Sequence, residues 1–248
     1  MAEPGATVFP LLQTVQVADN GTLRPSLNAM SGGATLTLDR SASRATFNIA
    51  DGALEVSNVV LTKTPTTVYH ETSGSTVIRL DFDALDWTAF GSWSVYPDRN
   101  PNGHYSEFVT GFQTPGTAVP TSGSATYDGV ATGNGGYLSG TAKLQTDFGA
   151  RTVTGTLTDM RAGDWDSGYL PWNTVSLSAS FASGQSRFSG TTAVTSAPGN
   201  DRSLGAGAVG TVLGSFFGPN AQEVGAVWTL FDGTRSAVGT IGAAATGP

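Results

Sequence analysis

A segment spanning residues 87–112 combines a histidine with a high density of aromatic residues. His104 lies within it, in a stretch that also carries Tyr96, Arg99 and Tyr105. An imidazole can ligate iron, aromatic rings can cover a macrocycle, and a guanidinium can pair with a propionate. The pattern is therefore typical of a haem site in which His104 is the metal ligand. A plainer interpretation stays open, in which the rings pack a core and His104 is solvated.

Tyr69 and His70 form a second candidate ligand pair. We expect them on a long connection from Thr62 to Ser75, and His104 on another from Tyr96 to Glu107, because both stretches exceed an ordinary hairpin loop and long ordered loops often carry function. If the two connections meet, ligation by two histidines or a site assisted by Tyr69 becomes possible.

The residues of an enzyme active site cannot be assembled from this sequence. The chain has two histidines and no cysteine, and no Gly-x-Ser-x-Gly element supplies a nucleophile. Carboxylates lie close together in two places, at Asp81, Asp83 and Asp86 and at Asp164 and Asp166. Either group could bind calcium or act as acid and base, but neither spacing matches a calcium loop, which favours solvated side chains. We predict that the protein is not an enzyme.

The composition excludes several classes of partner. The net charge is −7, and the twelve Lys and Arg residues are scattered singly, so no basic face is available for nucleic acid or an anionic membrane. No stretch approaches the roughly 20 apolar residues of a membrane-spanning helix. Only 12% of residues are charged and 33 are glycine, which indicates many short strands joined by tight turns.

Alternating apolar and polar residues predict eight antiparallel strands in the second half of the chain. One clear hairpin joins two such runs through Phe148–Arg151. The runs are centred near Tyr127, Leu144, Thr156, Leu177, Gly190, Leu213, Val227 and Val238. Eight such strands can close on themselves, so we expect residues 121–248 to form a filled barrel. Five glycines are expected to face its interior, namely Gly155, Gly190, Gly214, Gly225 and Gly239.

The first half of the chain is less regular. Strands are expected on both sides of a hairpin at Arg40–Arg44 and at Leu54–Leu61, Thr76–Phe82, Asp86–Val95 and Glu107–Gln113. The Pro- and Gly-rich stretch Thr114–Gly123 indicates a boundary between the two halves.

The motif from Gly214 to Gly225 resembles a signature of the C-terminal barrel of transferrin-binding-protein-B-like proteins, a group of exported surface proteins. This family also covers related surface lipoproteins and the secreted, haem-binding hemophilins. Pro120–Gly129 resembles its barrel entry, and Leu138–Ala142 with Asp147–Gly149 resembles its first hairpin. The resemblance covers residues 108 to 248.

The same motif has a structural explanation that needs no ligand. Gly218-Pro219-Asn220 is a turn, Phe216 and Phe217 place one ring on each face of a strand, and Glu223 starts the next strand.

The resemblance implies an irregular N-terminal β handle that captures a ligand, residues 1–115, followed by an eight-stranded antiparallel up-and-down β-barrel, residues 116–248. It also implies secretion, or display on the outer-membrane surface of a Gram-negative bacterium, with the export signal already removed. The function expected from it is that of a hemophore-like haem binder serving iron acquisition, with a possible outer-membrane receptor or export partner. The alternative is an interaction module that binds a host or outer-membrane protein without haem. A single lobe without cysteine departs from the two anchored lobes common among transferrin binders, which argues against transferrin as the ligand.

Overall fold

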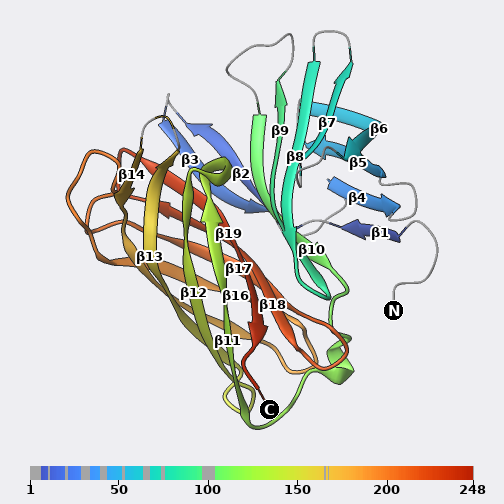
Figure 1. Ribbon diagram of the computed structural model, residues 1–248. Helices are drawn as coiled ribbons and strands as arrows, with labels where there is room; N and C mark the ends of the chain where they lie inside the picture. Colours follow the sequence, from blue (N-terminus) through green and yellow to red (C-terminus); the bar gives the residue numbers. More distant parts are fainter. Residues whose placement is uncertain are drawn as a thin grey trace.

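The computed structural model is an all-β protein built from two sheets (Figure 1). It describes residues 7–10, 12–19, 22–28, 34–39, 44–51, 54–63, 68–73, 76–96, 104–164, 166 and 168–247, with side chains at residues 83–94, 106–163, 166 and 168–247. Short 3-10 turns occur at η2 (Gly116–Ala118) and η3 (Asn134–Gly136). Across this described part of the chain, no helix has the length and apolar character needed to cross a membrane.

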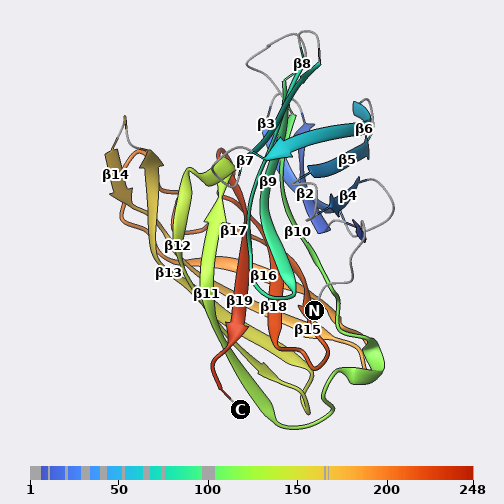
Figure 2. The ribbon, with the colours of Figure 1, turned by 45° about the vertical axis from the view of Figure 1, so that its right-hand side comes forward.

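The first ten strands form one sheet and the last nine form the other (Figure 2). The strands of the N-terminal sheet are β1 (Thr7–Pro10), β2 (Leu12–Asp19), β3 (Thr22–Asn28), β4 (Ala34–Asp39), β5 (Arg44–Asp51), β6 (Leu54–Lys63), β7 (Val68–Ser73), β8 (Thr76–Ala84), β9 (Thr88–Tyr96) and β10 (His104–Gly111). Those of the second sheet are β11 (Ser124–Gly133), β12 (Leu138–Asp147), β13 (Thr152–Asp164), β14 (Gly168–Pro171), β15 (Thr174–Phe181), β16 (Arg187–Ser196), β17 (Val209–Phe217), β18 (Glu223–Phe231) and β19 (Ser236–Ala245).

Eight strands of the second sheet close into a barrel. The order is β12-β11-β19-β18-β17-β16-β15-β13, and β12 pairs with β13 to complete the ring. Each of the eight predicted strand centres lies in one of these strands, so the predicted all-β class and closed antiparallel barrel are confirmed. The sequence did not indicate the short β14, which pairs with the end of β13.

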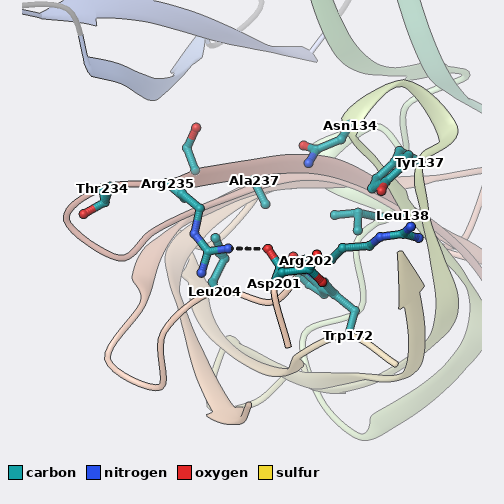
Figure 3. A pocket seen from close by; sticks show the side chains of 11 residues that line it. Asn134, Tyr137, Leu138, Trp172, Asp201, Arg202, Leu204, Thr234, Arg235 and Ala237 are labelled. Atoms are coloured by element: carbon teal, nitrogen blue, oxygen red, sulfur yellow. Dashed lines mark hydrogen bonds between the residues drawn. The ribbon is translucent and has the colours of Figure 1, made fainter. Parts of the chain in front are cut away.

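One end of the barrel is crossed by residues 197–208, the long connection between β16 and β17 (Figure 3). Side chains from the connection between β14 and β15 hold it in place. Asn173 makes two hydrogen bonds with the backbone of Leu204, at 2.9 and 2.8 Å, and the Trp172 indole N–H donates to the carbonyl of Arg202. Leu204 is buried in the barrel core, so the connection closes this end as a plug.

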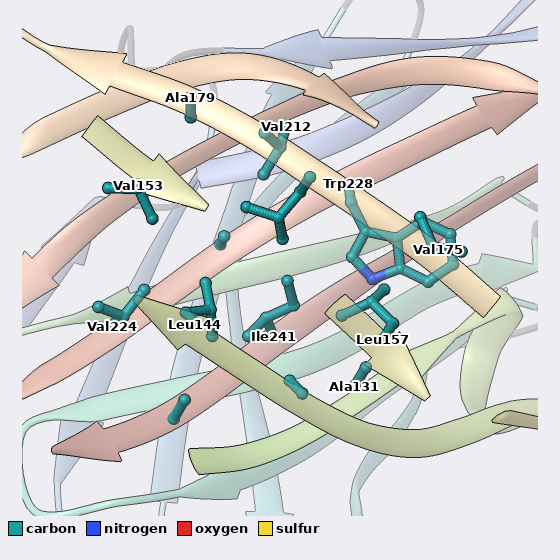
Figure 4. Packing of buried hydrophobic residues seen from close by; sticks show 14 of the residues in the cluster. Ala131, Leu144, Val153, Leu157, Val175, Ala179, Val212, Val224, Trp228 and Ile241 are labelled. Carbon is teal, nitrogen blue, oxygen red and sulfur yellow. The ribbon is translucent and has the colours of Figure 1, made fainter. Parts of the chain in front are cut away.

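Side chains fill the barrel interior, as the alternating pattern predicted (Figure 4). Phe216 is fully buried, and its ring lies 5.2 Å from that of Phe181 and 5.6 Å from those of Phe148 and Phe188. Trp228 occupies the region near the plugged end, 6.1 Å from Trp172. Burying an aromatic ring of this size stabilises a fold by about 3–5 kcal/mol relative to alanine, so the interior is a core.

The N-terminal sheet is assembled from distant strands. Its order is β1-β4-β5-β6-β7-β8-β9-β10-β2-β3, so the segments at its ends, β1 and the β2–β3 pair, come from the first 28 residues of the chain. The predicted hairpin at Arg40–Arg44 is confirmed as β4–β5, and the predicted strands at Leu54–Leu61 and Thr76–Phe82 lie in β6 and β8.

Two predicted long connections prove to be partly strand. The expectation of a loop from Thr62 to Ser75 is wrong, because β6 continues to Lys63 and β7 then pairs with both β6 and β8. The expectation for Tyr96 to Glu107 is also too long, since β10 begins at His104. Val68 and Tyr69 suit a pleated strand, and neighbouring strands on both sides satisfy the backbone of β7, which a search for simple alternation missed.

β9 and β10 of the N-terminal sheet pack against the outer face of the barrel at β18 and β19. Phe90 and Val109 form a buried cluster there with Phe217 and Val227 of the barrel. Phe216 and Phe217 therefore lie on opposite faces of β17, as predicted.

One of the five predicted inward glycines faces this junction instead. A Cβ on Gly225 would lie 2.4 Å from the Val109 side chain, so the expectation that Gly225 faces the interior is wrong. A Cβ on Gly214 would meet the buried ring of Phe188, and one on Gly239 would meet that of Trp228, as expected for inward positions. The glycine at 225 lets the two sheets approach closely, which alternation within one strand could not reveal.

Candidate functional site

The histidine and aromatic residues singled out in the sequence lie on strands of the N-terminal sheet. His104 is the first residue of β10 and pairs with Val95, and Tyr105 follows it. Tyr96 is the last residue of β9. Arg99 lies outside the described residues. The backbone therefore places Tyr96, His104 and Tyr105 at one end of the β9–β10 strand pair.

Tyr69 and His70 lie on β7, in the same sheet. The register runs from His70 through Arg79 of β8 and Ser94 of β9 to Tyr105 of β10. His104 is in the adjacent row, and because successive rows alternate between the two faces of a sheet, the register assigns His104 and His70 to opposite faces. Three strand spacings of about 4.8 Å separate β7 from β10, so the two motifs lie roughly 14 Å apart along the sheet. The fold thus brings residues more than 30 positions apart in the chain into neighbouring rows.

Three of the candidate carboxylates lie at the surface. Asp83, Asp86 and Asp166 are exposed, while the side chains of Asp81 and Asp164 lie outside the described set. In the described part of the chain, no cluster of three or more His, Cys, Asp or Glu residues could hold a metal ion.

Two buried glutamates join the sheet and the barrel, a role that no sequence pattern indicated. The carboxylate of Glu223, on the barrel, accepts the backbone N–H groups of Asp86 and Trp87 at 2.9 and 3.1 Å. In the opposite direction, Glu107 of the N-terminal sheet accepts the N–H of Gly135 in the η3 turn at 2.8 Å. Because each carboxylate accepts hydrogen bonds from the backbone of the other part of the molecule, the two glutamates hold β9 and β10 in a fixed position on the barrel.

A pocket of about 690 Å³ opens at the plugged end of the barrel (Figure 3). Its residues come from the β11–β12 turn and the start of β12, the connection between β14 and β15, the plug, and the β18–β19 turn with the start of β19. Trp172, Leu138, Leu204 and Ala237 provide an apolar floor, and each is buried. Sequence reasoning missed this pocket because its residues are dispersed over about 100 positions and share no motif.

Asp232 fixes the β18–β19 turn at the edge of this pocket. The backbone N–H groups of Arg235, Gly205 and Thr234 donate to its carboxylate at 2.7, 3.0 and 2.9 Å. These bonds, with the nearby positive charge of Arg235, lower the pKa of Asp232 to about 2. The carboxylate is therefore a structural anion at neutral pH rather than a general base.

Comparison with known proteins relates the barrel to one family. Residues 116–245 match the family model described as the C-lobe and N-lobe beta barrels of Tf-binding protein B. A mutant of Transferrin Binding Protein B from Haemophilus parasuis Hp5 is similar in structure, with a TM-score of 0.59 at 16% identity over 97% of this chain and 45% of that one. The isotype 1 protein from serogroup B Neisseria meningitidis has a TM-score of 0.56 at 20% identity over 97% of this chain and 44% of that one.

The chain thus spans less than half the length of these two proteins, and at such identities the likeness concerns the fold. No curated protein matches the chain.

Proposed function

The chain belongs to the family of transferrin-binding-protein-B-like proteins, and on that premise we propose that it is an exported binding protein serving iron acquisition. Its place is outside the cell or on the outer-membrane surface of a Gram-negative bacterium. The family model describes the barrels of a binding protein, and the sequence offers no nucleophile motif, so we propose binding without catalysis.

The observation that carries the proposal is the contrast between the filled barrel and the sheet beside it. Aromatic and aliphatic side chains occupy the barrel interior and form its core. The N-terminal sheet carries both histidine motifs in neighbouring rows, and buried glutamates clasp it to the barrel. We therefore assign ligand capture to the sheet and the role of a rigid support to the barrel.

The finer proposal is that the ligand is haem and that His104 ligates its iron. In the strand register, His104 and Tyr69 lie in rows that belong to one face of the sheet, whereas Tyr96, Tyr105 and His70 lie in rows of the other face. Tyr69 would therefore contribute to the site of His104 from β7, three strands away, and Arg99 is near in sequence. Support comes from this juxtaposition on one sheet and from the chemistry of imidazole, phenol and guanidinium groups toward a haem.

A hemin titration of the full chain tests this proposal. We expect a saturable Soret band with micromolar protein. His104→Ala should shift the Soret and visible bands, while Tyr69→Phe, on the same face of the sheet, should lower affinity with the bands largely kept, because the metal ligand is unchanged. His70→Ala is the matched histidine control and should do less. Absence of a saturable spectral change in the wild type would rule out haem as the ligand.

A second candidate function is capture of an iron-carrying host protein without haem. It is favoured by the family itself, since the two structural neighbours named above are transferrin-binding proteins. Surface plasmon resonance with immobilised iron-loaded transferrin, alongside the hemin titration, separates the two candidates. Saturable transferrin binding with no change in the hemin spectrum would select the protein partner.

A further inference from the structure

The η3 turn, which the N-terminal sheet contacts through Glu107, contains an asparagine followed by a glycine. Asn134 and Gly135 both have positive φ angles, 49° and 69°, and a Cβ on Gly135 would meet nothing within 4 Å. Gly135 is exposed, and Asn134 lines the pocket at the plugged end of the barrel (Figure 3). Because glycine has no side chain to shield its nitrogen, an asparagine in this position can modify itself.

The reaction open to this pair is intramolecular and needs only water. The backbone nitrogen of Gly135 gives its proton to solvent, and its lone pair attacks Cγ of Asn134. The Cγ–Nδ2 bond then breaks, and ammonia leaves with a proton taken from water, so that a succinimide remains. Water adds to one of the two imide carbonyl carbons and breaks one C–N bond, which gives aspartate from attack at Cγ and isoaspartate from attack at the backbone carbonyl carbon.

One hydrogen bond of the native turn favours this reaction. The backbone N–H of Val238, on β19, donates to Oδ1 of Asn134 at 3.1 Å. A fixed N–H on this oxygen stabilises the negative charge that develops there when a nucleophile adds to the carboxamide carbon. The fold therefore activates the electrophile of the pair.

A second hydrogen bond opposes the reaction, because it restrains the nucleophile. The N–H of Gly135 donates to Oε1 of Glu107 at 2.8 Å, and Glu107 is 1% exposed. The nitrogen must lose this proton before it attacks, and a buried carboxylate beside it disfavours a second negative charge. The turn thus combines an activated carboxamide with a restrained nitrogen, and the restraint comes from the N-terminal sheet.

We propose that Asn134 is a deamidation site that the Glu107 contact keeps unreacted while β10 is packed on the barrel. The contact and the reaction exclude each other, because the succinimide nitrogen of Gly135 carries no hydrogen to donate. Aspartate restores this N–H but adds a negative charge near Glu107, and isoaspartate adds a carbon to the backbone, so each product weakens the contact. The site concerns neither the ligand nor the partner of the chain, and it therefore goes beyond the proposed function.

Deamidation rates of the full chain and of a synthetic peptide of residues 130–138 test the protection. Peptide mass spectrometry after incubation in mildly alkaline buffer measures the conversion of Asn134 in both. The peptide has the same Asn-Gly pair but lacks Glu107. We expect Asn134 to react roughly tenfold to a hundredfold more slowly in the full chain, the effect of one hydrogen bond to a charged group.

Substitutions of the two junction glutamates assign the protection to one contact. Glu107→Ala removes the acceptor of the Gly135 N–H and should accelerate the conversion of Asn134 about tenfold or more. Glu107→Gln keeps an acceptor oxygen without the charge and should accelerate it less. Glu223→Ala is the matched control, because it weakens the same junction but leaves the acceptor of Gly135 in place, and it should change the rate little.

Asn20 and Asn102, which also precede glycines, are internal references in each sample, and Glu107→Ala should raise the rate at Asn134 relative to both. Conversion of Asn134 as fast in the full chain as in the peptide would overturn the proposal, as would an unchanged rate in both Glu107 variants. Equal acceleration by Glu107→Ala and Glu223→Ala would assign the protection to the packed sheet as a whole. Equal acceleration at all three asparagines would assign it to general unfolding, and either result would remove the role of the Glu107 contact.

Discussion

The barrel and the N-terminal sheet bury their strands in different ways. Each barrel strand pairs on both sides, and the ring closes through β12 and β13 around an interior filled by its own side chains. The N-terminal sheet is a ten-stranded row that ends at β1 and β3, and two of its described buried residues, Phe90 and Val109, pack on the outside of the barrel. Trp93 and Phe108 of the same strands are buried outside this junction. The barrel therefore has a core of its own, whereas the face of the sheet with Phe90 and Val109 is covered by the barrel.

This difference indicates that the N-terminal sheet depends on the barrel for its stability more than the barrel depends on the sheet. A barrel separated from the sheet loses the cover over Phe217 and Val227 but keeps its interior. A sheet separated from the barrel loses the partners of Phe90 and Val109 and the Glu223 carboxylate that satisfies two of its backbone N–H groups. We expect the fragment 116–248 to fold alone, with a cooperative thermal transition, and the rest of the chain not to.

The largest contrast is expected between two neighbouring phenylalanines on β17. Phe216→Ala should lower the free energy of unfolding by about 3–5 kcal/mol in both the full chain and the fragment, because its ring lies inside the barrel. Phe217→Ala should destabilise the full chain but leave the fragment nearly unchanged, since its ring packs on the N-terminal sheet. Guanidinium unfolding of the four proteins measures this. Equal losses for Phe217→Ala in chain and fragment would contradict the asymmetry.

The same asymmetry explains which parts of the fold could be predicted. In the barrel, neighbouring strands pair, so local alternation such as Thr174–Phe181 locates both a strand and its buried face. In the N-terminal sheet, β1 pairs with β4 and β10 pairs with β2, and such distant pairing leaves no local signal. Strand β7 has the sequence VYHETS, which is mostly polar and shows no alternation of apolar residues, so it resembles a loop in the sequence although it pairs with β6 and β8.

The functional residues follow the same rule. His104 and His70 stood out as residue types, but only the register of four strands shows that they occupy neighbouring rows. The sequence could not single out Glu107, Glu223 or the two arginines at the pocket, Arg202 and Arg235, because each contacts groups far along the chain. Glu223, for example, meets Asp86 across 137 positions. The motif around Glu223 predicted that a strand starts there, but it did not indicate the hydrogen bonds that this residue accepts from Asp86 and Trp87.

Substitution of Glu223, which joins the barrel to the N-terminal sheet, should have the next largest effect on the free energy of unfolding. Glu223→Ala leaves the N–H groups of Asp86 and Trp87 without their acceptor in a partly buried junction, which should cost about 2–4 kcal/mol in the full chain. Glu223→Gln keeps one acceptor oxygen and should cost less. In the fragment 116–248 both donors are absent, so neither substitution should matter much. A full-chain loss that the fragment reproduces would show that Glu223 acts within the barrel.

Two glycines on β19, one facing the N-terminal sheet and one facing the barrel interior, test the same difference with smaller expected losses of stability. A Cβ on Gly242 would lie 1.9 Å from the buried ring of Phe90, so Gly242→Ala should cost about 1–3 kcal/mol in the full chain through overpacking and little in the fragment. Gly239 faces inward, and its Cβ would lie 2.4 Å from Trp228, so Gly239→Ala should destabilise both proteins. Thermal melts of the four variants decide this, and a Gly242→Ala loss that persists without Phe90 would contradict the assigned face.

The smallest expected effect is a loss of stability at acid pH that involves Asp232. It should be the same in the full chain and in the fragment 116–248, because the hydrogen-bond donors to Asp232 lie in the barrel. The folded-state pKa of Asp232 is about 2, below its ordinary value of 3.8, since the N–H groups of Arg235, Gly205 and Thr234 stabilise the charged form. The stabilisation is therefore complete above about pH 4 and is lost as the pH falls toward 2.

Asp232→Asn removes this charge but retains an acceptor oxygen, so we expect its melting temperature to be about 2–4 °C lower at pH 5 and the gap to close as the pH approaches 2. Thermal melts between pH 2 and 5, on the full chain and on the fragment, measure both slopes. Parallel curves for the wild type and the Asp232→Asn variant would mean that the carboxylate contributes no acid dependence. A difference in melting temperature confined to the full chain would instead mean that the plugged end of the barrel, with Arg202 and Arg235, depends on the N-terminal sheet for its geometry.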